Sequence, residues 1–185
     1  MAKSRRKSRG KKINPTFWVF CEGETEESYI NFLKSLYRIS SIQIHSKVKG
    51  NAITSKYISA YKQDKPTHEK DINYLVYDLD VVGMQAKLEQ IKDCILLVSN
   101  PCVELWFLLH YKNQKSAVDS KYCYNQLNKR NKKYAKGFID EKLYEKLKDK
   151  YKEAIKRAKE LPKFNNPSST MYLFLEKLEE LKKNQ

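Results

Sequence analysis

The chain has 185 residues, within the usual size of a single domain, and 41% of them are hydrophobic, which is enough for a core. Its 37 Lys and Arg residues exceed its 22 Asp and Glu residues, and the formal net charge is +15. This excess favours a polyanionic partner such as nucleic acid, because neutralising phosphates releases condensed counterions. No apolar run reaches the roughly 18 residues that a membrane-spanning helix needs, so we expect no membrane partner.

The amino-terminal segment is basic and almost free of apolar side chains, which predicts a solvated, disordered tail over residues 1–15. It has no apolar stretch of the kind found in a secretion signal. The chain also lacks the cysteine spacing of a disulfide framework or a zinc site. The four cysteines lie in or beside apolar runs: Cys21, Cys94, Cys102 and Cys123. We therefore predict reduced thiols in a cytoplasmic protein.

Strands and helices are predicted to alternate from residue 16 onward. The short aromatic and β-branched run 17–21 is typical of a strand buried on both faces, and apolar residues at helical spacing follow over 24–37. Further elements are predicted as strands at 42–48, 72–77 and 94–98 and as helices over 52–61 and 84–92. This alternation predicts an α/β fold with a mainly parallel sheet and right-handed crossovers.

The second half of the chain is predicted to be helical. Segment 103–111 is apolar nearly all round, which indicates a buried helix. We place a boundary between an α/β core, 16–115, and a Lys-rich α-helical extension, 116–185, that packs on the core. Helices are predicted in the extension at 121–135, 139–161 and 168–183, with Ser168 or Ser169 as the cap of the last. No strand is expected after residue 119.

Acidic residues follow the first predicted strand. Ligands of parallel sheets bind beyond the carboxyl ends of strands, and Glu22 lies at such an end. Glu26 follows four residues later, so it lies on the same face as Glu22 if the helix has already begun at residue 22. Acids in the first turn also oppose the helix dipole favourably, and Glu24, Glu26 and Glu27 could serve only that purpose. Glu22 is harder to explain in this way. An acid after five apolar strand residues is costly unless it meets a cation, a donor or water.

A second acidic pair, Asp78 and Asp80, follows the strand predicted at 72–77. Because side chains alternate along a strand, both aspartates should point the same way. Like charges this close repel each other unless a cation lies between them. Oxygen ligands without a nearby His or Cys suit Mg²⁺ or Mn²⁺ rather than Zn²⁺. The alternative is a solvated loop start in which Asp80 only caps the next element.

Two motifs resemble known families. A Glu after one strand and D-x-D after another resemble the Toprim pattern of topoisomerases, primases and overcoming-lysogenization-defect nucleases. The sequence SNPCVELWFLLH at 99–110 resembles the S-N-P-x-x-E-x-W-x-x-L-H signature of the RloB-like family. These motifs lie within residues 16–111. The chain has E-G-E-T-E where the family often has E-G-x-x-T-E, a difference that affects the role of Glu26 more than that of Glu22.

The resemblance implies a Toprim-type metal-dependent nuclease from prokaryotic defence loci that works with a partner P-loop ATPase. Glu22, Asp78 and Asp80, with Glu26, would hold Mg²⁺ or Mn²⁺ and cleave phosphodiester bonds in DNA or RNA, with tRNA as one candidate. Glu22 could instead act as a general base or acid. The alternative is a non-catalytic nucleic-acid-binding or adaptor subunit of an ATPase complex. The chain itself has no P-loop motif.

Glu104 lies within the predicted buried helix and needs a partner, which could be a metal, a Lys or the turn at 99–100. We place it in the active-site layer. His110 could be a core histidine or a site residue. Residues of lower rank that could contact phosphate or orient ligands are Thr25, Lys47, Lys49 and Asn100. The tyrosines interleaved with lysines in the extension could stack on bases, although a helical Tyr stripe is more often core.

Deletion of residues 1–12 should weaken nucleic-acid binding, because it removes seven Lys and Arg side chains. The dependence of the logarithm of affinity on the logarithm of salt concentration should become shallower, while turnover at saturating substrate persists. Titration of a labelled oligonucleotide at several salt concentrations measures this slope. An unchanged slope would mean that the phosphate contacts lie elsewhere.

Overall fold

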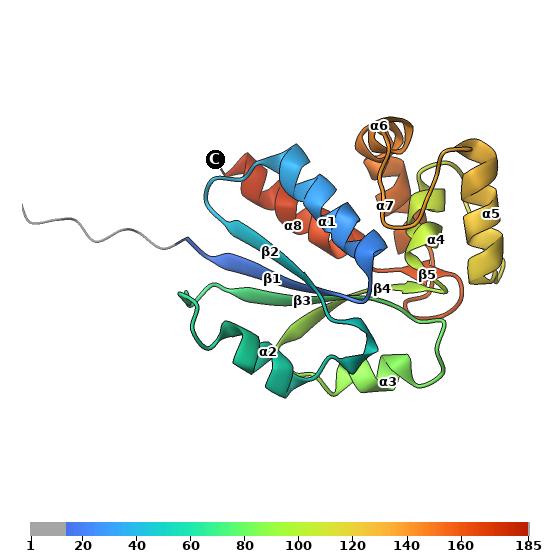
Figure 1. Cartoon of the computed structure of the whole chain (residues 1–185). Coiled ribbons are helices and arrows are strands. Elements are labelled where there is room, and N and C mark those ends of the chain that lie inside the picture. Colours follow the sequence, from blue (N-terminus) through green and yellow to red (C-terminus); the bar gives the residue numbers. More distant parts are fainter. Residues whose placement is uncertain (1–13, 185) are drawn as a thin grey trace, which may run out of the picture.

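A computed structural model describes residues 14–184, so that most of the predicted tail, 1–15, lies outside the described residues. Its centre is a five-stranded sheet in the order β2-β1-β3-β4-β5, in which the first four strands are parallel and β5 is antiparallel to β4 (Figure 1). The strands are β1 (Thr16–Cys21), β2 (Gln43–Val48), β3 (Ile72–Asp78), β4 (Cys94–Asn100) and β5 (Ser168–Ser169). The predicted α/β fold with a mainly parallel sheet is confirmed.

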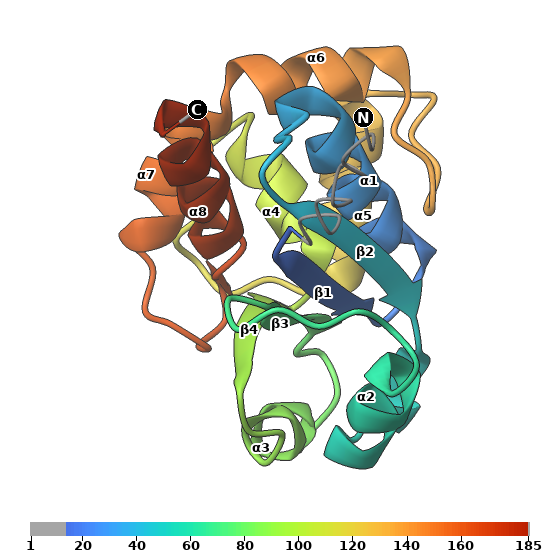
Figure 2. The ribbon, with the colours of Figure 1, turned by 90° about the vertical axis from the view of Figure 1, so that its left-hand side faces the viewer.

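Helices cover both faces of the sheet. Figures 1 and 2 show α1, α4, α6, α7 and α8 on one side and α2 and α3 on the other. The helices are α1 (Glu24–Tyr37), α2 (Ser55–Lys62), α3 (Met84–Glu89), α4 (Val103–Leu109), α5 (Ser120–Arg130), α6 (Glu141–Asp149), α7 (Tyr151–Lys159) and α8 (Tyr172–Lys183). All seven residues of α4 are buried, which confirms the buried helix predicted from segment 103–111.

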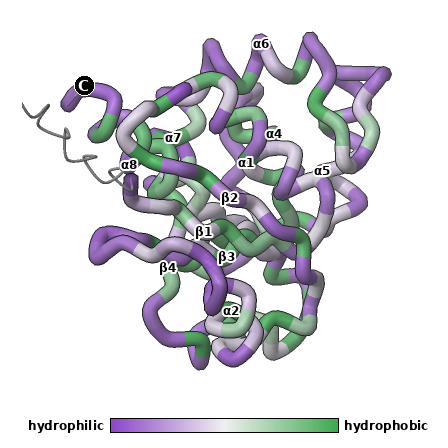
Figure 3. Tube along the Cα trace, turned by 60° about the vertical axis from the view of Figure 1, so that its left-hand side comes forward, coloured by the Kyte–Doolittle hydropathy of each residue, from purple (hydrophilic) through white to green (hydrophobic). Residues whose placement is uncertain are grey.

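Strand β1 is buried along its whole length because it lies between these two layers. Its side chains alternate between two hydrophobic clusters: Phe17 and Val19 belong to the cluster under α1 and α8, whereas Trp18 and Phe20 belong to the cluster over α2 and α3. Figure 3 shows hydrophobic stretches along the sheet and mostly hydrophilic outer segments. The strand predicted to be buried on both faces is therefore confirmed.

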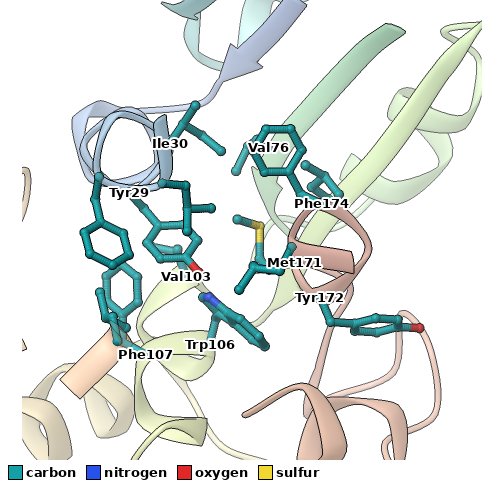
Figure 4. Packing of buried hydrophobic residues seen from close by; sticks show 14 of the residues in the cluster. Tyr29, Ile30, Val76, Val103, Trp106, Phe107, Met171, Tyr172 and Phe174 are labelled. Atoms are coloured by element: carbon teal, nitrogen blue, oxygen red, sulfur yellow. The ribbon is translucent and has the colours of Figure 1, made fainter. Parts of the chain in front are cut away.

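The main hydrophobic cluster continues across the boundary that we predicted between residues 115 and 116. It joins Phe17 of the sheet with Leu127, Leu143 and Phe174 of the extension. Figure 4 shows part of this packing, with Met171 and Phe174 beside residues of α1 and α4. The extension thus packs on the α/β core, and the position of the boundary stays a prediction. Within residues 14–184, no helix is long and apolar enough to cross a bilayer.

Two helices of the extension differ from their predicted bounds. The helix predicted at 121–135 ends at Arg130, and the one predicted at 139–161 is divided by Lys150, whose φ of −113° and ψ of 15° are not helical. Tertiary packing explains the division. Tyr144 of α6 packs edge-on against Phe32 of α1, whereas α7 packs against α4 and α8. Helical periodicity cannot report that the two halves have different neighbours.

The last predicted helix is present as α8, but its predicted start and cap, and the expected absence of a strand after residue 119, were wrong. Ser168 and Ser169 do not cap a helix; they form β5, which pairs with Asn100 and Ser99 of β4, and α8 begins only at Tyr172. A two-residue strand has no periodicity to detect, and its pairing depends on a partner far away in the chain.

Thr170 extends the pairing of β5 along the edge of β4. Its N–H donates to the Val98 carbonyl (2.8 Å), while its hydroxyl accepts from the Val98 N–H (2.8 Å) and donates to the Leu96 carbonyl (2.9 Å). The side chain and the backbone of one buried residue therefore satisfy three backbone groups of β4.

Replacement of Thr170 by Val should lower the free energy of unfolding by about 1–3 kcal/mol, because it leaves the buried Val98 N–H without an acceptor while preserving side-chain shape. Urea denaturation of the parent and the variant measures the difference. Thr67→Val is the matched control, since Thr67 is exposed, and it should stay close to the parent. Equal losses in both variants would contradict the proposed role of Thr170.

Candidate active site

The carboxyl ends of β1 and β3 and the amino-terminal ends of α1 and α4 meet at one edge of the sheet (Figure 1). Five predicted site residues gather there, and the charges of four of them act on the fifth, Asp78. We call them the acidic cluster: Glu22, Glu26, Asp78, Asp80 and Glu104. They come from three separate segments of the chain, at residues 22–26, 78–80 and 104.

Glu22 is tied to the end of the neighbouring strand. Its backbone N–H donates to the Val76 carbonyl (2.9 Å), which prolongs the pairing of β1 with β3, and its Oε2 accepts from the Asp78 N–H (2.9 Å). Burial raises the pKa of Glu22, and the negative charge of Asp80 raises it further; the Asp78 N–H opposes the shift. Glu22 is thus held in place as a half-buried carboxylate.

Asp78 is the centre of the acidic cluster. Its Oδ1 accepts from the N–H of Val103 (2.8 Å), the first residue of α4, so that one side chain joins β3 to this helix. Burial raises the pKa of Asp78 well above its usual range, and the charges of the other four members add to the rise. A carboxyl pKa raised by burial and by like charges is typical of functional sites.

Asp80 is exposed, and the Ser120 hydroxyl donates to its Oδ2 at 3.4 Å. It does not cap α3, whose N-cap is Gly83. Its charge acts on both Asp78 and Glu22, and the expected common direction of the two aspartates stays a prediction. Asp80 is therefore the member of the cluster that a ligand in solvent can approach most easily.

Glu26 makes the helix-start contact that we weighed as the alternative to a site role. Its Oε2 accepts from the Gly23 N–H (2.9 Å), which is the reciprocal contact of a helix start. Its side chain is nevertheless buried, and burial together with the charges of Glu22 and Glu104 raises its pKa. The helix start therefore holds this carboxylate within range of the charges of Glu22 and Glu104.

Glu104 is only 1% exposed, and its partners come from the connection between α5 and α6. The Tyr134 hydroxyl donates to its Oε1 (2.9 Å), and the Lys136 ammonium lies 3.7 Å from the same atom. Glu104 raises the pKa of Lys136, which keeps that side chain positively charged. Of the partners that we considered, the structure contains the Lys and not the 99–100 turn.

Lys136 was not predicted as a site residue, and Tyr134 was predicted only as one of the tyrosines of the core or of a stacking surface. No motif contains either residue. The one available signal was indirect: a buried acid such as Glu104 requires a donor or a cation. Which lysine of a Lys-rich extension supplies it depends on tertiary packing.

His110 lies at the opposite end of α4 from Glu104. Its Nδ1 is 2.9 Å from the Trp106 carbonyl, and its ring packs edge-on against the Trp106 ring with centroids 4.9 Å apart. Burial lowers the pKa of His110 to about 4. The structure therefore places it in the hydrophobic core as a neutral residue, apart from the acidic cluster.

The residues of lower rank have separate positions. Thr25 accepts a hydrogen bond from the Gly137 N–H (2.9 Å), and Asn100 donates to the Phe164 carbonyl (2.8 Å), so that both hold loops. The Lys49 ammonium lies 4.3 Å from the centre of the Tyr57 ring, and Lys47 is exposed on β2. Phosphate contact by these four residues stays a prediction.

The acidic cluster has the donor chemistry of a hard divalent cation, since it offers carboxylate oxygens without His or Cys. As the side chains stand, however, no three His, Cys, Asp or Glu residues in the described range 14–184 are spaced to hold a metal ion. Glu22, Glu26 and Asp78 each accept a backbone N–H through a single oxygen. A cation would have to draw the remaining oxygens together.

The fold and this edge define an α/β protein with carboxylates gathered at the carboxyl ends of parallel strands. The model of the family described as RloB-like protein matches residues 17–178, which is most of the chain. The chain therefore belongs to the RloB-like family. Comparisons with curated proteins and with solved structures gave no match.

Neutral burial of His110 should make stability depend on pH. Its folded-state pKa of about 4 lies below the ordinary value of 6.5, so the unfolded chain binds the proton more readily. The contribution is complete above about pH 6.5 and is lost as the pH falls toward 4, with a maximum of about 3 kcal/mol. The raised carboxylate pKa values of the acidic cluster stabilise the folded state as the pH falls, which is the opposite effect. The contribution of His110 is therefore isolated by comparing the parent with a variant at this position.

His110→Asn keeps a donor for the Trp106 carbonyl and removes the titrating ring. The free energy of unfolding of the parent should fall relative to that of this variant as the pH is lowered from 7 to 4.5. Denaturant titrations at each pH measure the difference, and NMR titration of the imidazole protons locates the pKa. A His110 titration near pH 6.5 would contradict the assignment.

Proposed function

We propose that this chain is a metal-dependent nuclease subunit of the Toprim type that cleaves phosphodiester bonds in nucleic acid. One observation carries the proposal: Asp78 is held with four other carboxylates at the edge of the sheet where parallel α/β proteins bind ligands, and burial together with their charges raises its pKa. Gathering these charges costs free energy unless a cation accompanies them. The family resemblance supports the same reading.

Glu22, Asp78 and Asp80, with Glu26, would hold Mg²⁺ or Mn²⁺. Such an ion, when bound, polarises a phosphoryl oxygen and lowers the pKa of a bound water. The chain itself positions these carboxylates: the Asp78 N–H orients Glu22, and the Val103 N–H orients Asp78. Glu22 is the candidate for a general base or acid, because its raised pKa brings its protonation closer to neutral pH.

The positive charge of the rest of the chain supports a polyanionic substrate, since the net charge is +15 in spite of the acidic cluster. DNA and RNA, including tRNA, both fit this charge. A role in anti-phage defence together with a P-loop ATPase is part of the proposal and rests on the resemblance alone.

A non-catalytic nucleic-acid-binding or adaptor subunit is the second candidate. It is favoured by the carboxylate contacts themselves, because Glu104 already has a hydroxyl and an ammonium as partners and Asp78 already accepts a backbone N–H. An assay with and without the partner ATPase and ATP separates the two. An intrinsic nuclease cuts without them, whereas an adaptor remains inactive by itself in every metal.

Mn²⁺ should raise the melting temperature of the parent, because a ligand that binds only the folded state stabilises it by mass action. Asp80→Asn should abolish the rise at little cost to the apoprotein, since Asp80 is exposed. Asp64→Asn, at another exposed aspartate, is the control and should respond like the parent. Differential scanning fluorimetry with and without Mn²⁺ measures these shifts.

Cleavage of a labelled oligonucleotide in Mg²⁺ or Mn²⁺ should fall more than about tenfold in Asp80→Asn, which corresponds to about 1.4 kcal/mol of transition-state stabilisation. EDTA should abolish the reaction of the parent. If Asp80→Asn matches Asp64→Asn in both the metal response and cleavage, the acidic cluster is not the metal site.

A further inference from the structure

The connection between α5 and α6 contains a tight turn, Ala135–Phe138, beside the acidic cluster. Ala135 and Phe138 form an antiparallel bridge, and the Phe138 N–H donates to the Ala135 carbonyl at 3.3 Å. Gly137 occupies the third position with a φ of 78°, which type II turns require and which side-chain-bearing residues rarely adopt. The turn therefore has a defined shape.

The Ala135–Phe138 turn is attached to the beginning of α1 through both backbone polar groups of Gly137. The Gly137 N–H donates to Thr25 Oγ1 (2.9 Å), and the Ser28 hydroxyl donates to the Gly137 carbonyl (2.5 Å). A Cβ at Gly137 would lie 3.3 Å from Glu24 Oε2, so the backbone approaches α1 closely. Because Glu26 belongs to the same helical turn, the attachment also fixes the turn next to the acidic cluster.

The turn presents a cation and an aromatic ring to solvent. The Lys136 side chain is 64% exposed although its ammonium reaches toward buried Glu104. Phe138 is 61% exposed, which makes it the most exposed aromatic residue among residues 14–184. The combination, an exposed ring two residues from an exposed cation and beside the acidic cluster, is what makes the turn available to a ligand.

We propose that the Ala135–Phe138 turn binds single-stranded nucleic acid at the acidic cluster, with Lys136 contacting a backbone phosphate and Phe138 stacking on an unpaired base. This inference rests on the proposed function and names its substrate class. An aromatic ring and a nearby cation are the usual means of holding a single strand, because every base has a stacking face. Bases inside a duplex are already stacked on each other and cannot accept the ring.

Charge around the turn supports nucleic acid rather than an apolar protein partner. The four cations that precede it, Lys129, Arg130, Lys132 and Lys133, line a surface pocket between α5 and α6 together with Asp140, Glu141 and Lys142. A nucleic-acid strand whose phosphate contacts Lys136 can therefore continue over further positive charges. Phosphate contacts of this kind supply affinity, while the exposed ring supplies the preference for unpaired bases.

Fluorescence anisotropy in EDTA, with a labelled single-stranded oligonucleotide and its duplex, tests the inference without any cleavage. The parent should prefer the single strand, and Phe138→Ala should weaken single-strand binding about fivefold or more while duplex binding stays unchanged. Ile95→Ala is the matched control, because Ile95 is also a partly exposed apolar side chain, on β4. It should bind both oligonucleotides like the parent.

Lys136→Ala should weaken single-strand binding and reduce the salt slope by about one, as expected for a lost phosphate contact. Lys148→Ala, which removes the same charge from an exposed position on α6, should have a smaller effect on the slope. A 2-aminopurine base in the oligonucleotide reports stacking directly. Its fluorescence should be quenched by the parent and recover in Phe138→Ala.

Equal affinity of the parent for single strand and duplex, or a Phe138→Ala variant that binds like Ile95→Ala, would overturn the inference. So would a parent that binds neither oligonucleotide, which would leave the exposed ring to a protein partner. Because binding and stacking are measured in EDTA, the absence of metal-dependent cleavage would defeat only the proposed function. If the parent binds single strand and duplex equally but still cleaves nucleic acid in a metal-dependent reaction, only this inference is defeated.

Discussion

Parallel pairing of β1 with β3 and of β3 with β4 determines where the acidic side chains lie. The pairing brings the carboxyl ends of these strands to one edge, and its last hydrogen bonds come from the site itself: the Glu22 N–H to the Val76 carbonyl and the Asp78 N–H to Glu22. Asp78 then accepts from Val103 and sets the start of α4. The same backbone donors that complete the fold thus hold the carboxylates in place.

Gathering the carboxylates at one edge costs folding free energy and also provides the oxygen ligands for the proposed cation. Burial and mutual repulsion raise the pKa of Asp78, Glu22 and Glu26, which is the physical basis for the proposed cation at this edge. The helical extension reduces the cost at Glu104 by bringing a hydroxyl and an ammonium to it. The extension is therefore part of the site as well as of the hydrophobic core, although composition separates it from the α/β part of the chain.

Sequence patterns predicted what depends on neighbouring residues. The aromatic run 17–21 and the apolar segment 103–111 are buried as expected, because alternation and all-round hydrophobicity report directly on the layers that cover an element. The acids at strand ends also meet as expected, because parallel strands end on one side. Patterns failed for β5 and for the division of α6 from α7, which depend on partners remote in sequence.

The sequence by itself determined the α/β alternation, the family and the carboxylates at the strand ends, because each of these follows from the order and spacing of residues that are close together in the chain. Only the tertiary structure decided that Lys136 and Tyr134 are the partners of Glu104, that Thr25 holds Gly137, and that Phe138 remains exposed beside the acidic cluster. The physical reason is that a Lys-rich helical extension offers many equivalent cations, and packing on the sheet selects which one meets the buried acid.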